Sequence, residues 1–472
     1  MNGRACISVA CLLLLAACAG TAPPAQVLTL PAAPPGWSIS AATPHAGTVL
    51  FDDPRLASMT ERAMQANQDI ALATARLRES RSQAGIAGSL TQLSVRATAS
   101  YARERESRNA PRPVMVSPAG ELEADRGGSE NLYQAGFDAS WEIDLFNARA
   151  NTLRAAQADA EASAQDAAAV RLSVAAEVAR QYVLLREAQL KGRLVRDELA
   201  LQQEWSQLAR ARRVGGMDSH AGEAMARSQA ARLEATLPQA KLDASTALHR
   251  LGVLLGQGPE ALRAELGGAG TLPRARAGVG LPLPSELLRR RPDILRAERQ
   301  LAASTARRAR AVADLYPKIT LGASVGVSSV SATDLFSAAS LLSKVGPSIT
   351  WPILRQGQIV GNIEVRDAQE LAAFSTYRQT ILLAFEEVEN SLAAMSAAGK
   401  RNASLAAMVI DGELAVALAQ ARYQGGMSDV RAVIDARIAL VQSRSELLHA
   451  DAVEASAAIT LSKAAGGSWT AR

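Results

Sequence analysis

Apolar and polar side chains alternate along four segments of the chain, and a period of two predicts β-strands with two unlike faces. The clearest segment is 133 to 145, where one face carries Tyr133, Ala135, Phe137, Ala139, Trp141, Ile143 and Leu145 and the other carries polar residues and glycine. Residues 93 to 101 alternate in the same way, and so do residues 319 to 327 and 345 to 353. Each half of the chain therefore supplies one pair of strands.

A second pattern, with apolar residues three and four positions apart, predicts long helices that pack as coiled coils. The segment from Ala148 to about Arg213 contains no proline and only one glycine, and the second half repeats the spacing at Ile381, Phe385 and Val388. A helix of about 65 residues is about 100 Å long, several times the roughly 30 Å of a bilayer's hydrocarbon core. Because these helices are charged throughout, we expect them in water, either as part of a closed helical wall or as an ordinary antiparallel bundle.

The two patterns occur twice in the same order, so the chain is predicted to be duplicated. Residues 51–265 form the first repeat and 284–465 the second, with a linker at 266–283 and a tail at 466–472. The first helix-to-strand junction is predicted to be about two residues shorter than the second, with Thr91 where the second repeat has Pro317. The fold class is mainly α with β: a strand pair and a long helical hairpin in each repeat.

Each long helix ends at a Gly-Gly-Met turn, Val214-Gly215-Gly216-Met217 in the first repeat and Gly425-Gly426-Met427 in the second. Glycine permits the positive φ that an abrupt reversal needs. Two interpretations remain open, since the glycines either only allow the reversal or also let another helical hairpin dock closely against the turn. The methionines distinguish these interpretations because turn geometry does not require them.

The N-terminus reads as a secretory signal over residues 1–17, with Arg4 before a short apolar run. Leu15-Ala16-Ala17-Cys18 resembles the bacterial lipobox, which implies a diacylglycerol and a palmitate chain on Cys18 and, with Ala19 next, sorting to the outer membrane. Residues 18–50 are proline-rich and are predicted to form an extended lipidated segment. All three cysteines lie within the first 18 residues, so no disulfide is expected in the mature chain.

Composition and charge exclude several other functions. The net charge is +5, but basic residues are interspersed with acids, so nucleic-acid binding is not indicated. The clusters Arg289-Arg290-Arg291 and Arg307-Arg308-Arg310 are interpreted as solvated helix faces or helix-end charges. The apolar positions form stripes rather than blocks, which argues against a large globular core. The histidines at 45, 220, 249 and 449 lack metal-ligand spacing and no catalytic motif is present, so we expect neither an enzyme nor a metal or other cofactor.

The strand segments have the length and two-sidedness of membrane-spanning strands, which need roughly 9 to 11 residues with apolar side chains toward lipid. A soluble sheet with one buried face is the alternative. Four strands cannot close a barrel, and an open edge in lipid leaves backbone groups unpaired, so closure would require several copies of the chain. Residues 104–131 and 331–342 would then be external loops.

Several strings along the mature chain resemble the TolC-like outer membrane factors, in the lipoprotein (NodT-type) branch that works with resistance-nodulation-division multidrug efflux pumps. The strings are Phe51-Asp52-Asp53-Pro54-Arg55-Leu56, Ser140-Trp141-Glu142-Ile143-Asp144-Leu145-Phe146 and Leu283-Pro284-Ser285-Glu286-Leu287-Leu288-Arg289-Arg290-Arg291-Pro292-Asp293-Ile294. The resemblance implies a homotrimer with a twelve-stranded β-barrel in the outer membrane and a twelve-helix periplasmic α-barrel. It implies a periplasmic adaptor protein that docks at the turns, an inner-membrane pump, and export of drugs or toxic compounds.

In that family the periplasmic end is closed by polar residues, and Tyr423 and Asp435 match such positions. Ala432 stands where some members have a second acid, so a weaker gate is expected. Two other functions remain open. One is the exit duct of a type I protein secretion system, and the other is a structural coiled-coil lipoprotein of the periplasm, which would not need the strands.

Overall fold

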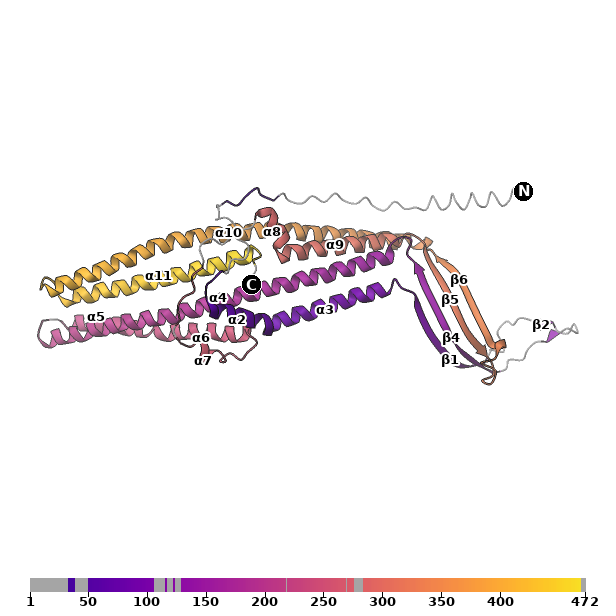
Figure 1. Ribbon diagram of the computed structural model, residues 1–472, viewed down its shortest axis with the longest axis horizontal. Helices are drawn as coiled ribbons and strands as arrows, with labels where there is room; N and C mark the ends of the chain where they lie inside the picture. The colour runs from indigo at the N-terminus through magenta and orange to yellow at the C-terminus, as the bar shows by residue number, and fades with distance from the viewer. Residues whose placement is uncertain are drawn as a thin grey trace. The chain divides into compact units, whose positions relative to one another are not determined.

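The computed structural model describes residues 33–38, 50–105, 115–116, 122–123, 129–217, 219–268, 270–275 and 283–467. Within them the chain is mostly helical and divides into two compact units. One unit contains the described residues within 80–160 and 300–374, and the other contains those within 29–79, 161–299 and 375–472. The helices in chain order are α2 (Pro54–Ala66), α3 (Gln68–Ser89), α4 (Ala148–Val214), α5 (His220–Glu234), α6 (Leu237–Leu254), α7 (Arg263–Leu266), α8 (Pro284–Arg290), α9 (Pro292–Ala313), α10 (Gln356–Gln424) and α11 (Val430–Ala464), labelled in Figure 1.

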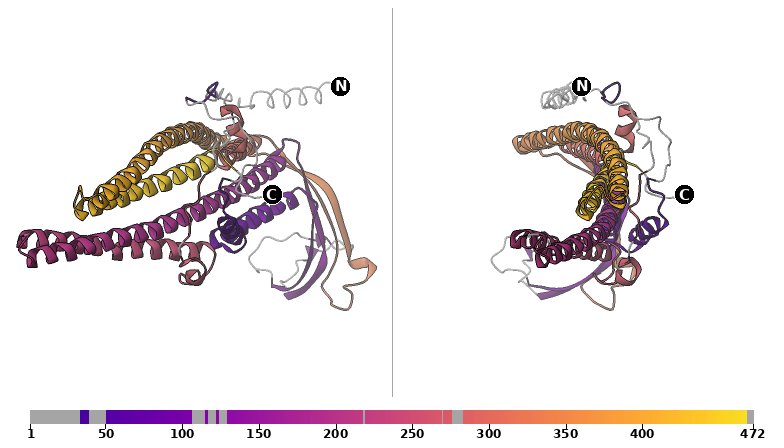
Figure 2. Two further views of the ribbon diagram at one scale, coloured as in Figure 1. Left: turned by 60° about the vertical axis from the view of Figure 1, so that its left-hand side comes forward. Right: turned by 90° about the vertical axis from the view of Figure 1, so that its left-hand side faces the viewer.

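The first unit contains an antiparallel sheet of four strands in the order β1 (Ser94–Arg105), β4 (Ser129–Ile143), β5 (Lys318–Ser329), β6 (Leu341–Thr350). The strands lie side by side and curve along their length (Figures 1 and 2). A separate two-stranded ribbon pairs β2 (Met115–Val116) with β3 (Leu122–Glu123) in the connection that we expected to be a loop. The prediction of four strands is confirmed, although each strand end differs from the predicted one by one to four residues. The segment predicted to run to Ile353 stops at Thr350, because Pro352 and the short 3-10 helix η2 (Ile353–Arg355) follow it.

The helices before the two strand pairs have the same length. Helix α3 and helix α9 each contain 22 residues and begin 224 positions apart, since 292 − 68 = 224. The strands that follow them, β1 and β5, begin at the same offset, since 318 − 94 = 224. The prediction of a shorter first junction was therefore wrong. By this offset the residue equivalent to Pro317 is Leu93 rather than Thr91.

The two long helices contain 67 and 69 residues, as the coiled-coil spacing predicted, but the return helices differ. In the second repeat α11 is continuous, whereas in the first repeat the return breaks after Glu234 and resumes at Leu237. Pro238 lies in the first turn of α6, where its missing N–H is harmless; inside a helix it would remove a hydrogen bond. Figures 1 and 2 show α5 beside α4 and α11 beside α10.

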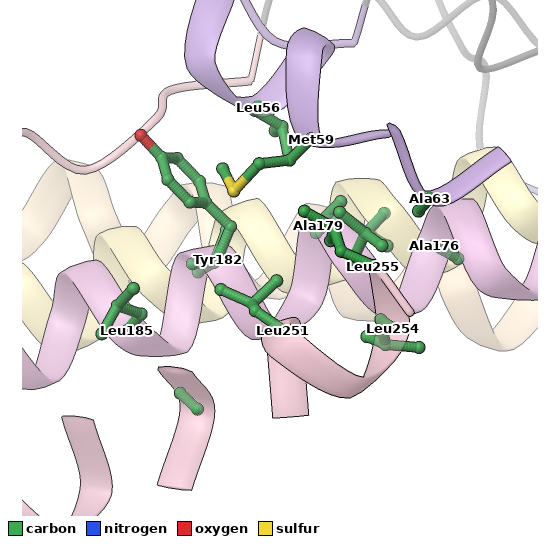
Figure 3. Close-up of a cluster of buried hydrophobic side chains, with 14 of the residues drawn as sticks. Leu56, Met59, Ala63, Ala176, Ala179, Tyr182, Leu185, Leu251, Leu254 and Leu255 are labelled. Atoms are coloured by element: carbon green, nitrogen blue, oxygen red, sulfur yellow. The ribbon is translucent and has the colours of Figure 1, made fainter. Parts of the chain in front are cut away.

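The second unit contains a hydrophobic core that the stripes in the sequence did not predict (Figure 3). Met59 from α2, Tyr182 and Leu185 from α4, and Leu251 from α6 are essentially inaccessible to solvent. The Tyr182 hydroxyl donates a 2.8 Å hydrogen bond to Asp53, whose carboxylate also caps the first turn of α2. Because the members of this core come from separate helices, periodicity within any one helix could not indicate it.

The two repeats contain equivalent hydrogen bonds at the end of the return helix. The Asn67 side chain donates to the Leu254 carbonyl at 2.9 Å, and Arg291 Nη1 donates to the Ala464 carbonyl at 2.9 Å. These pairs correspond, since 291 − 67 = 224 and 464 − 254 = 210, the offset between the two Gly-Gly turns. In each repeat the helix-helix junction thus caps the last turn of the return helix, whose carbonyls have no helical partner.

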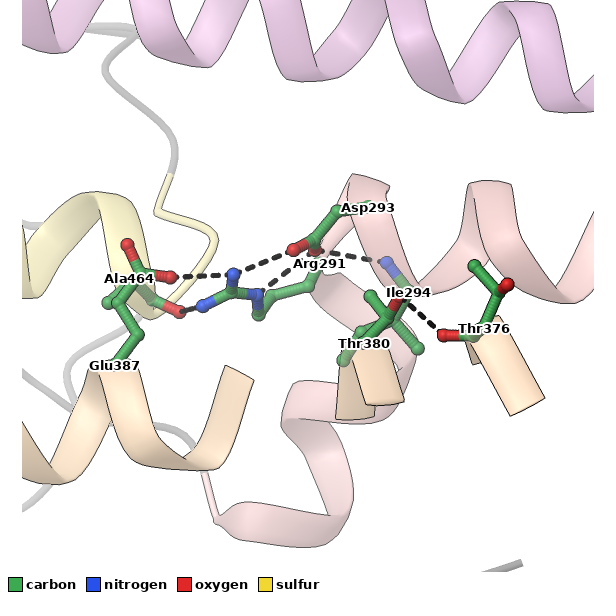
Figure 4. A network of polar contacts seen from close by, with 7 residues as sticks. All are labelled: Arg291, Asp293, Ile294, Thr376, Thr380, Glu387 and Ala464. Carbon is green, nitrogen blue, oxygen red and sulfur yellow. Dashed lines mark hydrogen bonds and ion pairs between the residues drawn. The ribbon is translucent and has the colours of Figure 1, made fainter. Parts of the chain in front are cut away.

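Arg291 is buried, so of the two interpretations of its cluster the solvated face is wrong for this residue (Figure 4). The helix-end charge is confirmed, since Arg291 directly follows α8 and donates to the carbonyl at the end of α11. Its guanidinium forms ion pairs at 2.7 Å with both Asp293 and Glu387. Burial alone would raise the pKa of Asp293, but the hydrogen bonds and charge of Arg291 outweigh it and lower that pKa. In the other cluster Arg308 is also mostly buried, between Asp367 and Glu370.

One helix region, Ile353–Gln424, is long enough to cross a membrane and contains an apolar stretch of 18 residues. No part of that stretch is buried. Ile410, Leu414 and Leu418 on this helix are more than half exposed and lie four residues apart, so they form one apolar stripe on its surface. Length and composition alone are weak evidence for a membrane helix.

Candidate functional site

The four-stranded sheet has one apolar and one polar face, and both are open to solvent in the single chain. On the apolar face Phe137, Val345 and Ile349 are 58%, 76% and 69% exposed. Such large apolar side chains are usually covered in a soluble sheet. The opposite face carries serine, threonine, glycine and charged residues, as the alternation predicted. Strands β1 and β6 form the two edges, each with one neighbour in this sheet.

The two Gly-Gly-Met turns have the same geometry. Gly216 and Gly426 have φ of 73° and 69°, whereas Gly215 and Gly425 do not have positive φ, so only the second glycine of each pair is required by the backbone. The Met217 N–H bonds to the Arg212 carbonyl and the Met427 N–H to the Arg422 carbonyl, both at 2.8 Å. This is the Schellman arrangement that closes a helix C-terminus.

Met217 and Met427 are each 71% exposed. The methyl group of each lies over the first glycine of its turn, since a Cβ on Gly215 or Gly425 would be 3.2 or 3.1 Å from it. Each hairpin therefore presents an exposed methionine at its turn. Val214, beside the first turn, is 73% exposed.

An ion pair that the sequence did not reveal joins the ends of the two hairpins. Arg212, at the end of α4, contacts the carboxylate of Asp429, the residue before α11. The hydrogen bond from Arg212 lowers the pKa of Asp429 and outweighs the opposing effect of burial. A second pair, between Arg213 and Glu223, links the two arms of the first hairpin. The spacing of 217 residues between Arg212 and Asp429 left no signal that sequence reasoning could detect.

Tyr423 and Asp435, the predicted gate residues, lie on α10 and α11 on either side of the second turn, and both side chains are exposed. Within the described part of the chain no hydrogen bond joins them to each other. Asp435 instead lies 3.5 Å from Arg431, one helical turn away, and the Arg431 guanidinium lies 4.6 Å from the centre of the Trp205 ring. Ala432 is also exposed. Any gate built on Asp435 therefore includes an adjacent cation.

Cys18 and His45 lie outside the described residues. Of the N-terminal segment, Trp37 packs against Phe385 with ring centres 6.2 Å apart, and the Ser38 N–H donates to Glu389 at 3.0 Å, so this short stretch lies against α10. His249 and His449 are paired with Glu260 and Glu187 at 2.6 and 2.7 Å. No group of three or more His, Cys, Asp or Glu side chains that could hold a metal ion occurs among the residues described.

Comparison with known proteins gives consistent matches over nearly the whole chain. The sequence model of the outer membrane efflux protein family matches residues 59–257 and 283–467. The pyoverdine export outer membrane protein OpmQ of Pseudomonas aeruginosa is 29% identical over 463 residues, which cover 97% of this chain and 95% of that protein. The toluene efflux pump outer membrane protein TtgF of Pseudomonas putida is 30% identical over 359 residues, 76% of this chain and 73% of that protein. The structure of the outer-membrane channel OprN is similar with a TM-score of 0.83 and 29% identity, and the match covers 94% of this chain and 99% of that one.

Proposed function

The chain belongs to the outer membrane efflux protein family, and on that premise we propose that three copies close a transmembrane barrel through which small molecules leave the periplasm. It is an outer-membrane efflux channel and a transport protein, as its relatives that export pyoverdine and toluene are. The finer proposal concerns how one chain, which carries only four strands, becomes a closed duct.

The open-edged sheet with one exposed apolar face carries the proposal. In lipid the apolar face is stable, but the unpaired N–H and C=O groups along the edge strands β1 and β6 would each cost several kcal/mol. Pairing β6 of one copy with β1 of the next satisfies both edges. Three copies give 3 × 4 = 12 strands from the four that each sheet contains, which exceeds the about eight of the smallest membrane barrels.

The helices support the same assembly. The exposed stripe formed by Ile410, Leu414 and Leu418 would be costly in water, and a helix of a neighbouring copy would cover it. With α4 and α10 long and charged, the helices of three copies would form a twelve-helix wall in the periplasm. Cys18 would carry the lipid anchor, and palmitate label lost in a Cys18→Ala variant would show it.

The Gly-Gly-Met turns would dock a periplasmic adaptor, and Asp435 with Tyr423 would narrow the bore near the same end. The inner-membrane partner would be a pump of the resistance-nodulation-division type. A type I secretion duct is the rival, and the genes adjacent to this one would decide between them. A purely structural coiled-coil lipoprotein is disfavoured because it has no use for the two-faced sheet.

Cysteine crosslinking tests the closure directly. Ala97→Cys on β1, combined in turn with cysteines along β6, should give covalent dimers and trimers. Strands β1 and β6 of one chain are separated by two strands, about 14 Å, which is too far for an internal disulfide. As a control, Ala97→Cys with Phe137→Cys joins register partners within one chain and should give only monomers on a denaturing gel. Absence of intermolecular crosslinks at every β6 position would refute the trimeric barrel.

A further inference from the structure

The polar face of the sheet carries opposite charges in a single row across all four strands. Arg96 on β1 is directly opposite Asp138 on β4, Asp138 is opposite Ser324 on β5, and Ser324 is opposite Lys344 on β6. Residues directly opposite in antiparallel strands point to the same face. The four side chains therefore lie at one level of the sheet, which we name the Arg96 row.

The neighbouring rows on this face are uncharged. On one side they contain Thr98, Gly136, Gly326 and Leu342, and on the other Ser94, Ser140, Gly322 and Gly346. Gly136 and Gly326 are opposite each other, and a Cβ on either would lie 2.7 or 2.6 Å from a carbonyl oxygen of the adjacent strand, so no larger residue fits there. Charges on this face recur only toward the strand ends, at Glu104, Glu130, Glu142 and Lys318. Leu342 at the β6 edge is the one large side chain in these two rows and is itself exposed, so the remaining positions leave the Arg96 row open to water and to a passing solute.

The Arg96 row has an excess of positive charge. Arg96, Lys344 and Asp138 are all exposed, and no ion pair joins them among the described residues. In the described strands the Asp138 carboxylate accepts a long hydrogen bond of 3.4 Å from Thr98 and no other. The sum is two cations and one anion, +1 for each chain, which becomes 3 × (+1) = +3 for three copies.

We infer that the Arg96 row forms an electropositive ring around the barrel lumen and favours organic anions among the solutes that pass. This inference rests on the proposed trimeric barrel. Twelve strands spaced about 4.8 Å apart and tilted by about 40° give a backbone radius of roughly 12 Å, before the side chains narrow the bore. The Debye length is about 8 Å at physiological salt, so the field of the ring reaches much of that bore. Rings of charged side chains set ion preference in other pores by the same physics.

A cysteine at the neutral position of the row can report the local potential. The Ser324→Cys variant places a thiol between Asp138 and Lys344, and the mature chain's other cysteine is Cys18. The trimer is treated with a sulfonate-bearing and a trimethylammonium-bearing methanethiosulfonate, and each rate is divided by the rate with a small thiol in solution. The ratio of the two normalised rates depends on the electrostatic potential at the Arg96 row, whichever part of the channel limits conductance.

For Ser324→Cys alone, the normalised reaction rate of the anionic reagent should exceed that of the cationic reagent, so the ratio of the two rates should exceed one. Adding Arg96→Gln and Lys344→Gln should lower it by about fivefold, the effect of removing two charges within roughly 5–10 Å in screened water. Adding Asp138→Asn should raise it. The matched control is Arg103→Gln, which removes the same charge from the other face of β1 and should leave the ratio unchanged.

A ratio that does not respond to the paired Arg96 and Lys344 change, in trimers that react with both reagents, would overturn the inference and leave the barrel intact. If the Ser324→Cys thiol reacts with neither reagent in assembled trimers, the position is not in a water-filled lumen and the proposed function fails with it. If the variant with both Arg96→Gln and Lys344→Gln does not assemble, Asp138→Asn alone tests the inference. Its expected change in the rate ratio has the opposite sign, and an unchanged ratio would overturn the inference.

Discussion

Replacement of Arg291 by methionine removes the guanidinium that joins three helices of the second unit. In the native protein it lies between Asp293 at the start of α9, Glu387 on α10 and the carbonyl of Ala464 at the end of α11. Methionine keeps the length and the apolar contacts of the side chain but not its charge. The substitution therefore leaves two carboxylates close together and one helix-terminal carbonyl without its donor.

The expected cost follows from these contacts. Breaking a buried ion pair by removing one partner destabilises a protein by about 3–5 kcal/mol. The carboxylates of Asp293 and Glu387 are 34% and 39% exposed, so partial rehydration reduces the penalty to roughly 2 kcal/mol. Loss of the hydrogen bond to the Ala464 carbonyl adds about 1 kcal/mol. The total is about 3 kcal/mol of local stability at the C-terminal turn of α11.

Amide hydrogen exchange of the purified protein measures this local stability. A loss of about 3 kcal/mol should speed exchange in the last turn of α11 by about a hundredfold, with little change near Met427. Combining Arg291→Met with Asp293→Asn and Glu387→Gln should restore most of the protection, since no unpaired charge then remains. Arg289→Met is the matched control, because Arg289 is exposed on the preceding helix.

The pH dependence follows from the lowered pKa of Asp293. A depressed pKa contributes stability above the carboxyl's ordinary value of about 3.9, and the contribution is lost as the pH falls through the folded-state pKa. The difference between the native protein and Arg291→Met should therefore be constant near neutral pH and shrink below about pH 4. Unchanged exchange in Arg291→Met at pH 7 would refute the assigned role of this network.

Three further predictions test the membrane face, the gate and the turns. Trp141→Arg should lower the yield of trimer, because an arginine near the bilayer midplane destabilises a membrane barrel by about 2–4 kcal/mol. Asp138→Asn should have only a mild effect on the yield. Equal trimer yields of the two variants on gels would indicate a soluble sheet. Asp435→Ala should raise conductance in planar bilayers and weaken block by cations, and unchanged conductance would move the gate elsewhere. Changing Met217 and Met427 together to Glu should leave the trimer and its conductance intact but abolish adaptor crosslinking and drug resistance. Normal resistance at native expression would exclude docking through these side chains.

The sequence alone determined the elements of this protein because their periods are local properties. Alternation at 133 to 145 and three-four spacing after Ala148 depend only on neighbours within a few residues, and both predicted the correct type of element. The glycines in each turn also predicted the reversal correctly, since positive φ is a local requirement of the backbone. The family resemblance rested on short strings of the same local kind.

Only the tertiary structure decided which distant residues meet. The sequence left Arg291 as either a solvated charge or a helix-end charge, because its partners Glu387 and Ala464 are 96 and 173 positions away. The pairing of Arg212 with Asp429 and the alignment of Arg96 with Lys344 were hidden for the same reason. Strand register and helix packing bring such residues together through long-range contacts, and those contacts leave no periodic signal in the segments that make them.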